Sequence, residues 1–187
     1  MNVLEALKKR RAIRNYENRE ITKDVIETLL EVATWAPNDR NREPWSFFVI
    51  KDEAKKRYEN MAEQYLEERF PTKPNLIKSS LDVVTSTPVI IVATADITSD
   101  DEAASTDNEY AVCCAIHSMW LAAEELGLGF VWRTRGVGLV RDQRLYEFIG
   151  APENKKIIGT VFIGYPQENL ELTDKRRKSY DNKTIWL

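Results

Sequence analysis

Four short apolar runs alternate along this chain with segments of helical periodicity, and this alternation limits the folds that the chain can adopt. The runs have the length and the β-branched or aromatic content typical of strands: Phe47–Ile50, Val89–Thr94, Phe130–Arg133 and Ile157–Gly164. Helices are predicted from Val3, from the N-cap candidate Thr22 to Trp35, and over 53–69, 75–86, 108–126 and 142–149. Their order along the chain predicts an α+β sandwich with helices over a sheet.

The 187 residues fit a single domain, 1–187, because no repeat or linker divides them. The polar, acidic stretch 97–107 predicts a mobile loop before the helix at 108–126. Residues 165–187 end in the apolar triplet Ile185-Trp186-Leu187, which favours a C-terminal arm laid over a partner subunit. The alternative is a tail that folds back on its own chain.

Charge and hydropathy exclude several classes of protein. A formal net charge of −3 gives no overall attraction to nucleic acid. The longest uncharged runs, 83–95 and 110–123, are shorter than the ~18 residues that a membrane span needs. The first residues contain no apolar signal core, so we expect a cytoplasmic protein.

Missing motifs exclude further chemistries. His117 is the only histidine, which excludes zinc sites with two histidines, and we predict no metal site. No GxGxxG, GxxxxGK[ST] or GxSxG pattern occurs, so a Rossmann or P-loop phosphate cradle and a nucleophile elbow lack support. The adjacent Cys113 and Cys114 are expected to be small core residues. Met119 and Trp120 on the same helix are expected in the core from their helical spacing. We expect His117 to be packed or hydrogen-bonded rather than an acid or base.

Three clusters of polar and aromatic residues are candidates for binding chemistry. In Arg10-Arg11-x-x-Arg14 the guanidinium groups suit a phosphate or a delocalised anion, although cations at a helix C-terminus also complement the helix dipole. Residues 37–45 (PNDRNREPW) form either a binding loop or an ordinary polar loop. Residues 127–135 (GLGFVWRTR) place Trp132 and Arg133 near the end of a strand that, on the simpler interpretation, belongs to the core.

In this order and spacing, the three clusters resemble the nitroreductase family of flavin enzymes. RRAIR at 10–14 resembles the family's RRSIR opening, and residues 36–47 (APNDRNREPWSF) resemble its AP…N-x-QPW-x-F block. Residues 88–93, LGLG at 126–129 with the following Trp132, and IGYP at 163–166 are similar to its AP-x-IIV, LGLG and iGyP elements. The resemblance covers nearly the whole chain and is nearest to the short members of the family.

The resemblance implies a three-layer sandwich, with a mostly antiparallel sheet flanked by helices, in an intertwined homodimer that binds FMN between its subunits. The implied cofactor residues of one chain are Arg10, Arg11, Ala12, Arg14, Trp132, Arg133, Thr134 and Arg177. The first three would meet the phosphate, ribityl chain and pyrimidine side of the flavin, and the last would contact the phosphate. The implied residues of the partner chain are Trp35, Asn38, Asp39 and Asn41.

Two positions depart from the family pattern. Ala12 stands where the family has serine, so only its backbone can replace the hydroxyl contact. Glu43 stands where the family has glutamine before Pro-Trp, and its charge opposes a negative reduced flavin unless Arg40 or Arg42 neutralises it.

The resemblance implies an FMN-dependent oxidoreductase that passes electrons from NAD(P)H through flavin N5 to an electron-poor acceptor, such as a nitroaromatic or a quinone, in a ping-pong cycle. No side chain need act as an acid or base, and a cation near flavin N1 and O2, either Arg14 or Arg133, would stabilise the reduced form. One alternative is a non-catalytic flavin-binding or regulatory protein. Another is a basic-patch protein whose residues 8–19 bind nucleic acid or phosphorylated ligands.

The spacing of the first two clusters favours a homodimer. They lie on either side of the second helix, which at about 14 residues spans roughly 21 Å. One FMN cannot readily reach both ends of that helix in one chain, whereas two chains related by a twofold axis bring one set of arginines to the other chain's loop.

Overall fold

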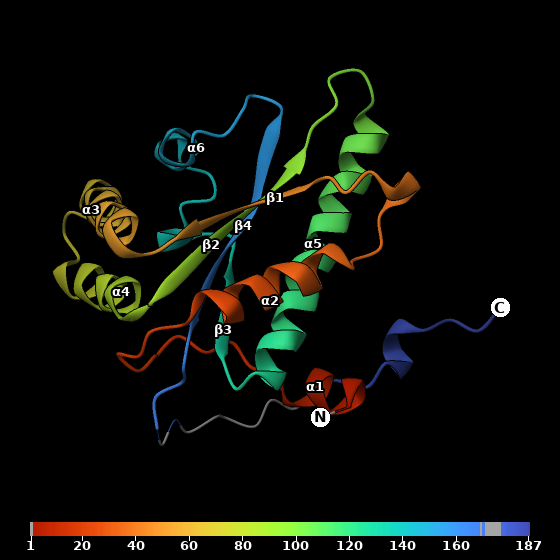
Figure 1. Cartoon of the computed structure of the whole chain (residues 1–187), viewed down its shortest axis with the longest axis horizontal. Coiled ribbons are helices and arrows are strands. Elements are labelled where there is room, and N and C mark those ends of the chain that lie inside the picture. Colours follow the sequence, from red (N-terminus) through yellow and green to blue (C-terminus); the bar gives the residue numbers. More distant parts are fainter. Residues whose placement is uncertain (1, 169, 171–176) are drawn as a thin grey trace.

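The computed structural model describes residues 2–168, 170 and 177–187. Its centre is a four-stranded sheet in the order β1 (Trp45–Ile50), β2 (Val89–Asp96), β4 (Lys155–Gly164), β3 (Gly129–Arg133), as Figure 1 shows. Every neighbouring pair of strands is antiparallel. The four predicted strands are therefore confirmed, and each is one or two residues longer than its apolar run.

Helices cover both faces of this sheet. One face packs against α2 (Lys23–Thr34) and α5 (Glu102–Glu125). The other face carries α3 (Asp52–Arg69), α4 (Pro74–Ser86) and α6 (Gln143–Ile149). A shorter helix, α1 (Val3–Lys9), lies against the C-terminal end of α5 (Figure 1). The predicted three-layer α+β sandwich is confirmed.

Strand β2 belongs to both hydrophobic cores. Its side chains alternate, as the pleat requires, so that Ile91 and Ala93 face the α2–α5 side while Ile90 and Val92 face the α3–α4 side. All four are completely buried. Burial of a side chain as large as isoleucine contributes about 1.5–3 kcal/mol, so this strand anchors both layers.

The chain segment that follows α1 runs along the free edge of β3. Ala12 pairs in parallel with Phe130, and the N–H of Ile13 donates to the carbonyl of Phe130 at 3.1 Å. The buried Tyr16 hydroxyl lies 2.9 Å from the carbonyl oxygen of Phe162 on β4 and donates a hydrogen bond to it. A Cβ at Gly164 would come within 2.7 Å of Tyr16, so glycine is required for this close approach. These contacts fix the arginine-rich segment 10–14 to the sheet.

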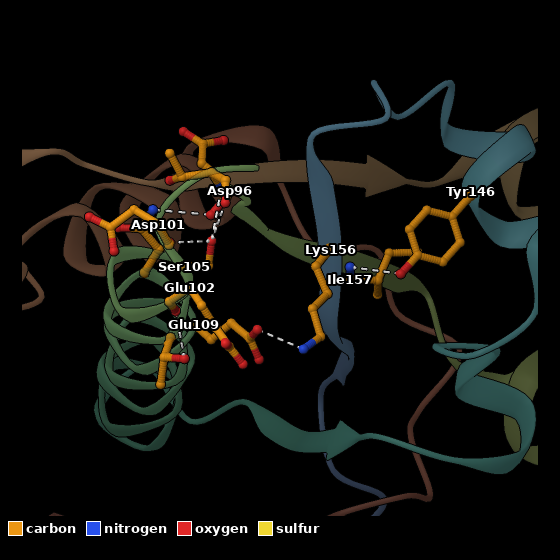
Figure 2. Close-up of polar contacts among 11 residues, drawn as sticks. Asp96, Asp101, Glu102, Ser105, Glu109, Tyr146, Lys156 and Ile157 are labelled. Carbon is orange, nitrogen blue, oxygen red and sulfur yellow. Dashed lines mark hydrogen bonds and ion pairs between the residues drawn. The ribbon is translucent and has the colours of Figure 1, made fainter.

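Helix α5 begins earlier than the sequence predicts. Its N-cap is Asp101, whose carboxylate accepts the N–H of Ala104 at 2.8 Å, and the Ser105 hydroxyl accepts the N–H of Thr98 at 2.8 Å (Figure 2). The prediction of a loop over 97–107 is therefore wrong for residues 102–107. Acidic residues favour the first turn of a helix because of its dipole, so a polar composition there does not exclude helix.

An ion pair ties the first half of α5 to the sheet. Lys156 on β4 donates to the carboxylate of Glu109 at 2.6 Å, and the backbone N–H of the next residue, Ile157, donates to the Tyr146 hydroxyl of α6 at 3.1 Å (Figure 2). The two contacts lie on opposite sides of β4 and hold helices of both layers to one strand. None of the helices in the described chain combines the length and the apolar character that a membrane span requires.

Candidate functional site

Arg10 lies at the C-cap of α1 and stacks on the far end of α5. Its guanidinium carbon is 4.0 Å from the ring centre of Trp120, which itself stacks on Phe130. Burial lowers the pKa of Arg10, and the charges of Arg177 and Arg11 lower it further, while Glu124 acts in the opposite direction. The predicted phosphate ligands Arg10 and Arg177 are thus close enough to repel one another, which leaves an excess of positive charge at this point.

Arg11 has a structural task. One of its terminal nitrogens donates to the carbonyls of Lys8, Lys9 and Arg10 at 2.8, 2.9 and 3.1 Å. These carbonyls lie at the C-terminal end of α1, where the last carbonyl groups of a helix have no backbone N–H of the same helix to accept from. For Arg11, therefore, the helix-dipole interpretation of the arginine cluster describes the contacts that the structure contains.

Arg133 ends β3 with a partly buried charge that has no ion pair among the described residues. Its guanidinium lies 4.8 Å from the ring centre of Phe162, and its Nε is buried without a hydrogen-bond partner among the described residues. Burial, followed by the charge of Arg14, lowers the pKa of Arg133, and the phenols of Tyr16 and Tyr58 act in the opposite direction. Buried polar atoms without partners are rare and each requires an explanation.

The neighbours of Arg133 in sequence complete this end of the strand. Trp132 points to the opposite face, where its indole N–H is also buried without a partner in the described part of the chain. A Cβ at Gly159 would overlap that indole, so β4 leaves room for the ring by using glycine. Thr134 follows the strand and is exposed, as is Arg14, whose guanidinium reaches back to the Ala12 carbonyl at 3.4 Å.

The loop between α2 and β1 adopts a strained conformation. Arg40, Asn41 and Glu43 all have positive φ angles, 52°, 53° and 49°. The side chain of Asn38 closes the loop, since its oxygen accepts the N–H of Glu43 at 2.9 Å and its amide donates to the carbonyl of Ala36 at 3.3 Å. Left-handed backbone at non-glycine residues costs free energy and clusters at ligand-binding sites. Asn38 therefore shapes the loop, and Asn41 is exposed.

The two arginines of this loop face Asp39 and not Glu43. Arg42 pairs with Asp39 at 2.9 Å, and Arg40 approaches the same carboxylate at 3.8 Å. Glu43 is exposed and has no ion pair within the described residues, so neither Arg40 nor Arg42 pairs with it in this chain. Both arginines are engaged by the nearer carboxylate.

Within one chain, the predicted cofactor residues form two separate groups. The loop residues Asn38 and Asp39 line a hollow with Tyr110 of α5, whereas Arg10 packs on Trp120 of the same helix. Ten residues separate Tyr110 from Trp120, a rise of about 15 Å. Figure 1 shows the same separation, with the loop beside the first half of α5 and α1 beside its end. The exposed Trp35, 81% accessible, belongs to the loop group.

The structure corrects two expectations on α5 and confirms others. Met119 is buried and Trp120 is partly buried against the core, as predicted. Cys114 is exposed and Cys113 half-buried, so a core position for Cys114 is wrong. His117 is exposed overall and, although partial burial lowers its pKa, makes no hydrogen bond within the described chain, so its predicted packing is wrong as well. Both residues lie on a face of α5 that this chain leaves uncovered.

Sequence reasoning missed the two tyrosines beside Arg133. Tyr16 bonds across to β4, and the Tyr58 hydroxyl of α3 donates to the carbonyl of Val137 at 2.7 Å. Both contacts join residues far apart in the chain, so no local pattern signals them. Among the described residues, no group of three potential metal ligands occurs.

The molecule is an α+β sandwich that carries arginines on the β3 edge and a strained amide loop beside the first half of α5. The family model described as "Nitroreductase family" matches residues 7–165, and the chain belongs to this family.

Individual relatives agree with this assignment. A protein of Archaeoglobus fulgidus named "Putative NADH dehydrogenase/NAD(P)H nitroreductase" is 32% identical over 159 residues, which are 85% of this chain and 82% of the relative. A nitroreductase-like family protein from Bacillus cereus has a solved structure with 27% identity and a TM-score of 0.85, covering 100% of this chain and 96% of that one. A structure described as nitroreductase with bound FMN, from Bacteroides fragilis, is 23% identical with a TM-score of 0.76 and covers 100% of both chains.

Proposed function

We propose that this protein is an FMN-dependent oxidoreductase that passes electrons from NAD(P)H to an electron-poor aromatic acceptor such as a nitroaromatic or a quinone. The observation that carries the proposal is the partly buried guanidinium of Arg133, whose buried Nε has no partner in the described residues. A buried cation without a counter-charge lowers the stability of the fold. Its presence at the β3 edge is explained if an electron-rich group binds beside it.

The residues at this edge fit FMN. Arg10 and Arg177, whose charges act on one another, would offer two guanidinium groups to a phosphate, and charge-assisted hydrogen bonds from guanidinium to phosphate are strong. Arg14 and Arg133 would keep positive charge beside the pyrimidine ring, and Trp132 and Thr134 would lie along the ring system. Ala12 has no hydroxyl to offer, so its backbone would serve. Family membership and the FMN of the Bacteroides fragilis structure support the same cofactor.

The protein's own residues would bind, orient and polarise rather than transfer protons. FMN, when bound, supplies the two-electron redox chemistry. Arg14 and Arg133 would stabilise negative charge at the pyrimidine side, whereas the exposed carboxylate of Glu43 would oppose it from the partner's loop. His117 lies beside Arg10, at the proposed phosphate end, and takes no part in proton transfer. The donor NAD(P)H and the acceptor would use one exposed site in turn, so we expect ping-pong kinetics.

We further propose that the working unit is an intertwined homodimer with FMN between its subunits. The single chain leaves large apolar side chains exposed near both groups of cofactor residues: Trp35, Tyr110, Val3 and Leu4. A twofold axis would bring Trp35, Asn38, Asp39 and Asn41 of the partner subunit to the arginines of this chain.

The C-terminal residues would contribute to the same dimer. Residues 1–187 form one domain in this proposal, with 165–187 as an arm over the partner. Pro166 pairs with Tyr16 at the start of this segment, and Trp186 near its end is 88% exposed. Residues 169 and 171–176 of the arm lie outside the described residues. An apolar end of this kind favours contact with a second chain.

The test is the visible spectrum of the purified protein, followed by addition of NADH or NADPH without oxygen. We expect a bound flavin whose absorbance bleaches and returns when a quinone or nitroaromatic is added. Protein that neither carries nor takes up FMN would contradict the proposal. A bound flavin that neither nicotinamide reduces would favour the non-catalytic flavin-binding alternative.

A further inference from the structure

A cavity of about 480 Å³ opens on the α3–α6 side of the sheet, next to the end of β3. Its walls are the C-terminal end of α3 and the chain between β3 and α6. Tyr65 and Phe70 supply aromatic surface, and Arg69, Arg135 and Arg141 surround the opening. The volume falls within the ~300–1,000 Å³ typical of small-molecule sites.

The charge of this cavity is positive and unbalanced. None of the three arginines makes an ion pair or side-chain hydrogen bond with the residues that the structure describes. The carboxylate that lines the cavity, Asp142, is occupied, because Arg144 binds it at 2.8 Å; Arg144 also binds Glu68 at 3.0 Å. Arg144 also holds the pKa of Asp142 below its ordinary value, so this carboxylate stays charged and paired. Three guanidinium groups therefore remain available to a ligand.

The wall formed by residues 134–142 is held in place before any ligand binds. Thr160 of β4 donates to the carbonyl of Gly138 at 2.6 Å, and Tyr58 of α3 donates to that of Val137. Leu139 adopts a left-handed conformation, with φ 54°, and is buried beneath the cavity. A wall anchored to both β4 and α3 costs little to organise on binding, which favours affinity.

The cavity begins where the proposed cofactor site ends. Thr134 belongs to the strand-end segment Trp132–Thr134 and also lines the cavity. A molecule that reacts at the proposed flavin could therefore extend a charged group toward Arg135 and Arg141. This step rests on the function proposed above.

We propose that this cavity is an anion subsite, in which Arg69, Arg135 and Arg141 bind the carboxylate or phosphate of an aromatic molecule oxidised or reduced at the adjacent site. Tyr65 and Phe70 pack against its apolar part. The bound anion would be either the 2′-phosphate of NADPH or an acidic group on the acceptor. The subsite gives the enzyme a preference for charged over neutral substrates of the same shape.

Two matched ligand pairs test the subsite by calorimetry on the purified protein, without turnover. One pair is para-nitrobenzoate and the neutral para-nitrobenzamide, and the other is NADP⁺ and NAD⁺. We expect the more anionic member of at least one pair to bind about fivefold more tightly at low ionic strength, and the preference to shrink as salt screens the charges. The pair that shows the preference identifies the source of the anion.

Substitution of the three arginines is the second test of the subsite. Arg135→Gln and Arg141→Gln should each reduce the preference, and the combination with Arg69→Gln should abolish it. Arg57→Gln removes an exposed arginine of α3 outside the cavity and should leave the preference unchanged. Thermal melting of each variant checks that it folds.

Equal affinities within both pairs, or a preference that survives the triple substitution, would overturn the subsite. Failure of the proposed function is a separate result. A protein that NAD(P)H does not reduce can still distinguish the two ligands of a pair, and a working oxidoreductase can fail to do so.

Discussion

The guanidinium of Arg10 stacks 4.0 Å above the indole ring of Trp120, and this contact fixes an N-terminal arginine against the end of the long helix α5. A cation–π contact of this kind contributes about 0.5–2 kcal/mol, depending on its exposure to water. Stacking uses the flat face of the guanidinium and leaves its N–H edge available. Since Arg10 has no ion pair within the described chain, that edge can serve an anion.

Arg10→Gln should weaken FMN retention by about tenfold to a hundredfold, because a hydrogen bond to a charged group contributes on the order of 1.5–3 kcal/mol. Fluorescence titration of the apoprotein with FMN measures the change. Lys8→Gln removes a neighbouring charge of α1 that has no assigned role, and it should leave the affinity unchanged. An unaltered affinity in Arg10→Gln would remove this residue from the phosphate site.

His117 reports on the same site because it is the only histidine of the chain. Burial, followed by the charge of Arg10, lowers the pKa of His117. Both FMN binding and Arg10→Gln should raise this pKa toward its ordinary value, since a phosphate offsets the repulsion and the substitution removes it. An NMR titration of the single imidazole measures the shift, and a pKa that ignores both changes would contradict the placement of the phosphate.

The same lowered pKa predicts how stability depends on pH. Protonation of His117 is less favourable in the folded apoprotein than in the unfolded chain, so its contribution to stability is present above pH ~6.5 and is lost as the pH falls below that value. His117→Gln should remove this part of the pH dependence. It should also leave turnover within a few-fold of the parent, and a large loss of turnover in a folded variant would show that the imidazole has a catalytic role.

Arg133→Met should act on stability and on the cofactor in opposite directions. Replacement of a partly buried, unpaired charge by an apolar side chain should stabilise the apoprotein by up to about 1 kcal/mol, measured by urea unfolding. The same change should make bound FMN harder to reduce, by about 30 mV, which corresponds to about 1.4 kcal/mol for two electrons. Arg57→Met, which replaces an exposed arginine of α3, is the control for the potential and should leave it unchanged. A destabilised apoprotein would show that Arg133 has a structural partner.

Tyr16→Phe should loosen the arginine segment from the sheet. The hydroxyl lies 2.7 Å from the carbonyl oxygen of Ile13 and 2.9 Å from that of Phe162, and both acceptors are buried. We expect a loss of about 1 kcal/mol in the free energy of unfolding, together with weaker FMN binding. Tyr180→Phe removes an exposed hydroxyl and should be neutral. Full stability in Tyr16→Phe would mean that other contacts suffice to hold the segment.

The homodimer predicts that flavin binding depends on protein concentration. Sedimentation at decreasing concentration, followed at the flavin absorbance, should show FMN lost in step with dissociation. Trp35→Arg should promote both losses, whereas Leu76→Arg, an exposed position of α4 on the opposite side of the sheet, should not. A monomer that keeps stoichiometric FMN would contradict a site shared between subunits.

The strands and most helices were predictable because their signals are local. Runs such as Val89–Thr94 contain enough β-branched residues to identify a buried strand without knowledge of its partners. The start of α5 was missed because Asp101 and the acidic residues after it are as typical of a helix N-terminus as of a loop. The order of strands within the sheet depends on contacts between distant residues, which a single sequence does not reveal.

The candidate site was predictable as a set of residues but not as a set of roles. The sequence does not distinguish the three arginines at 10, 11 and 14. In the structure Arg10 stacks on an indole, Arg11 donates to the last carbonyls of a helix, and Arg14 is exposed. Cys114 was assigned to the core because its neighbours are apolar. Its exposure depends on which face of α5 the same chain leaves uncovered, and a second chain is the simplest covering for that face.

The pairing of Tyr16 with β4 has a consequence for how the protein is made. The two partners of this hydrogen bond, Tyr16 and Phe162, are 146 residues apart. During synthesis the chain emerges from its N-terminus and folds as it appears, so the arginine segment leaves the ribosome long before the strand edge that receives it exists. The arginine segment therefore reaches its final place only after β4 has been made, and a nascent or truncated chain that lacks β4 should be unable to retain a cofactor.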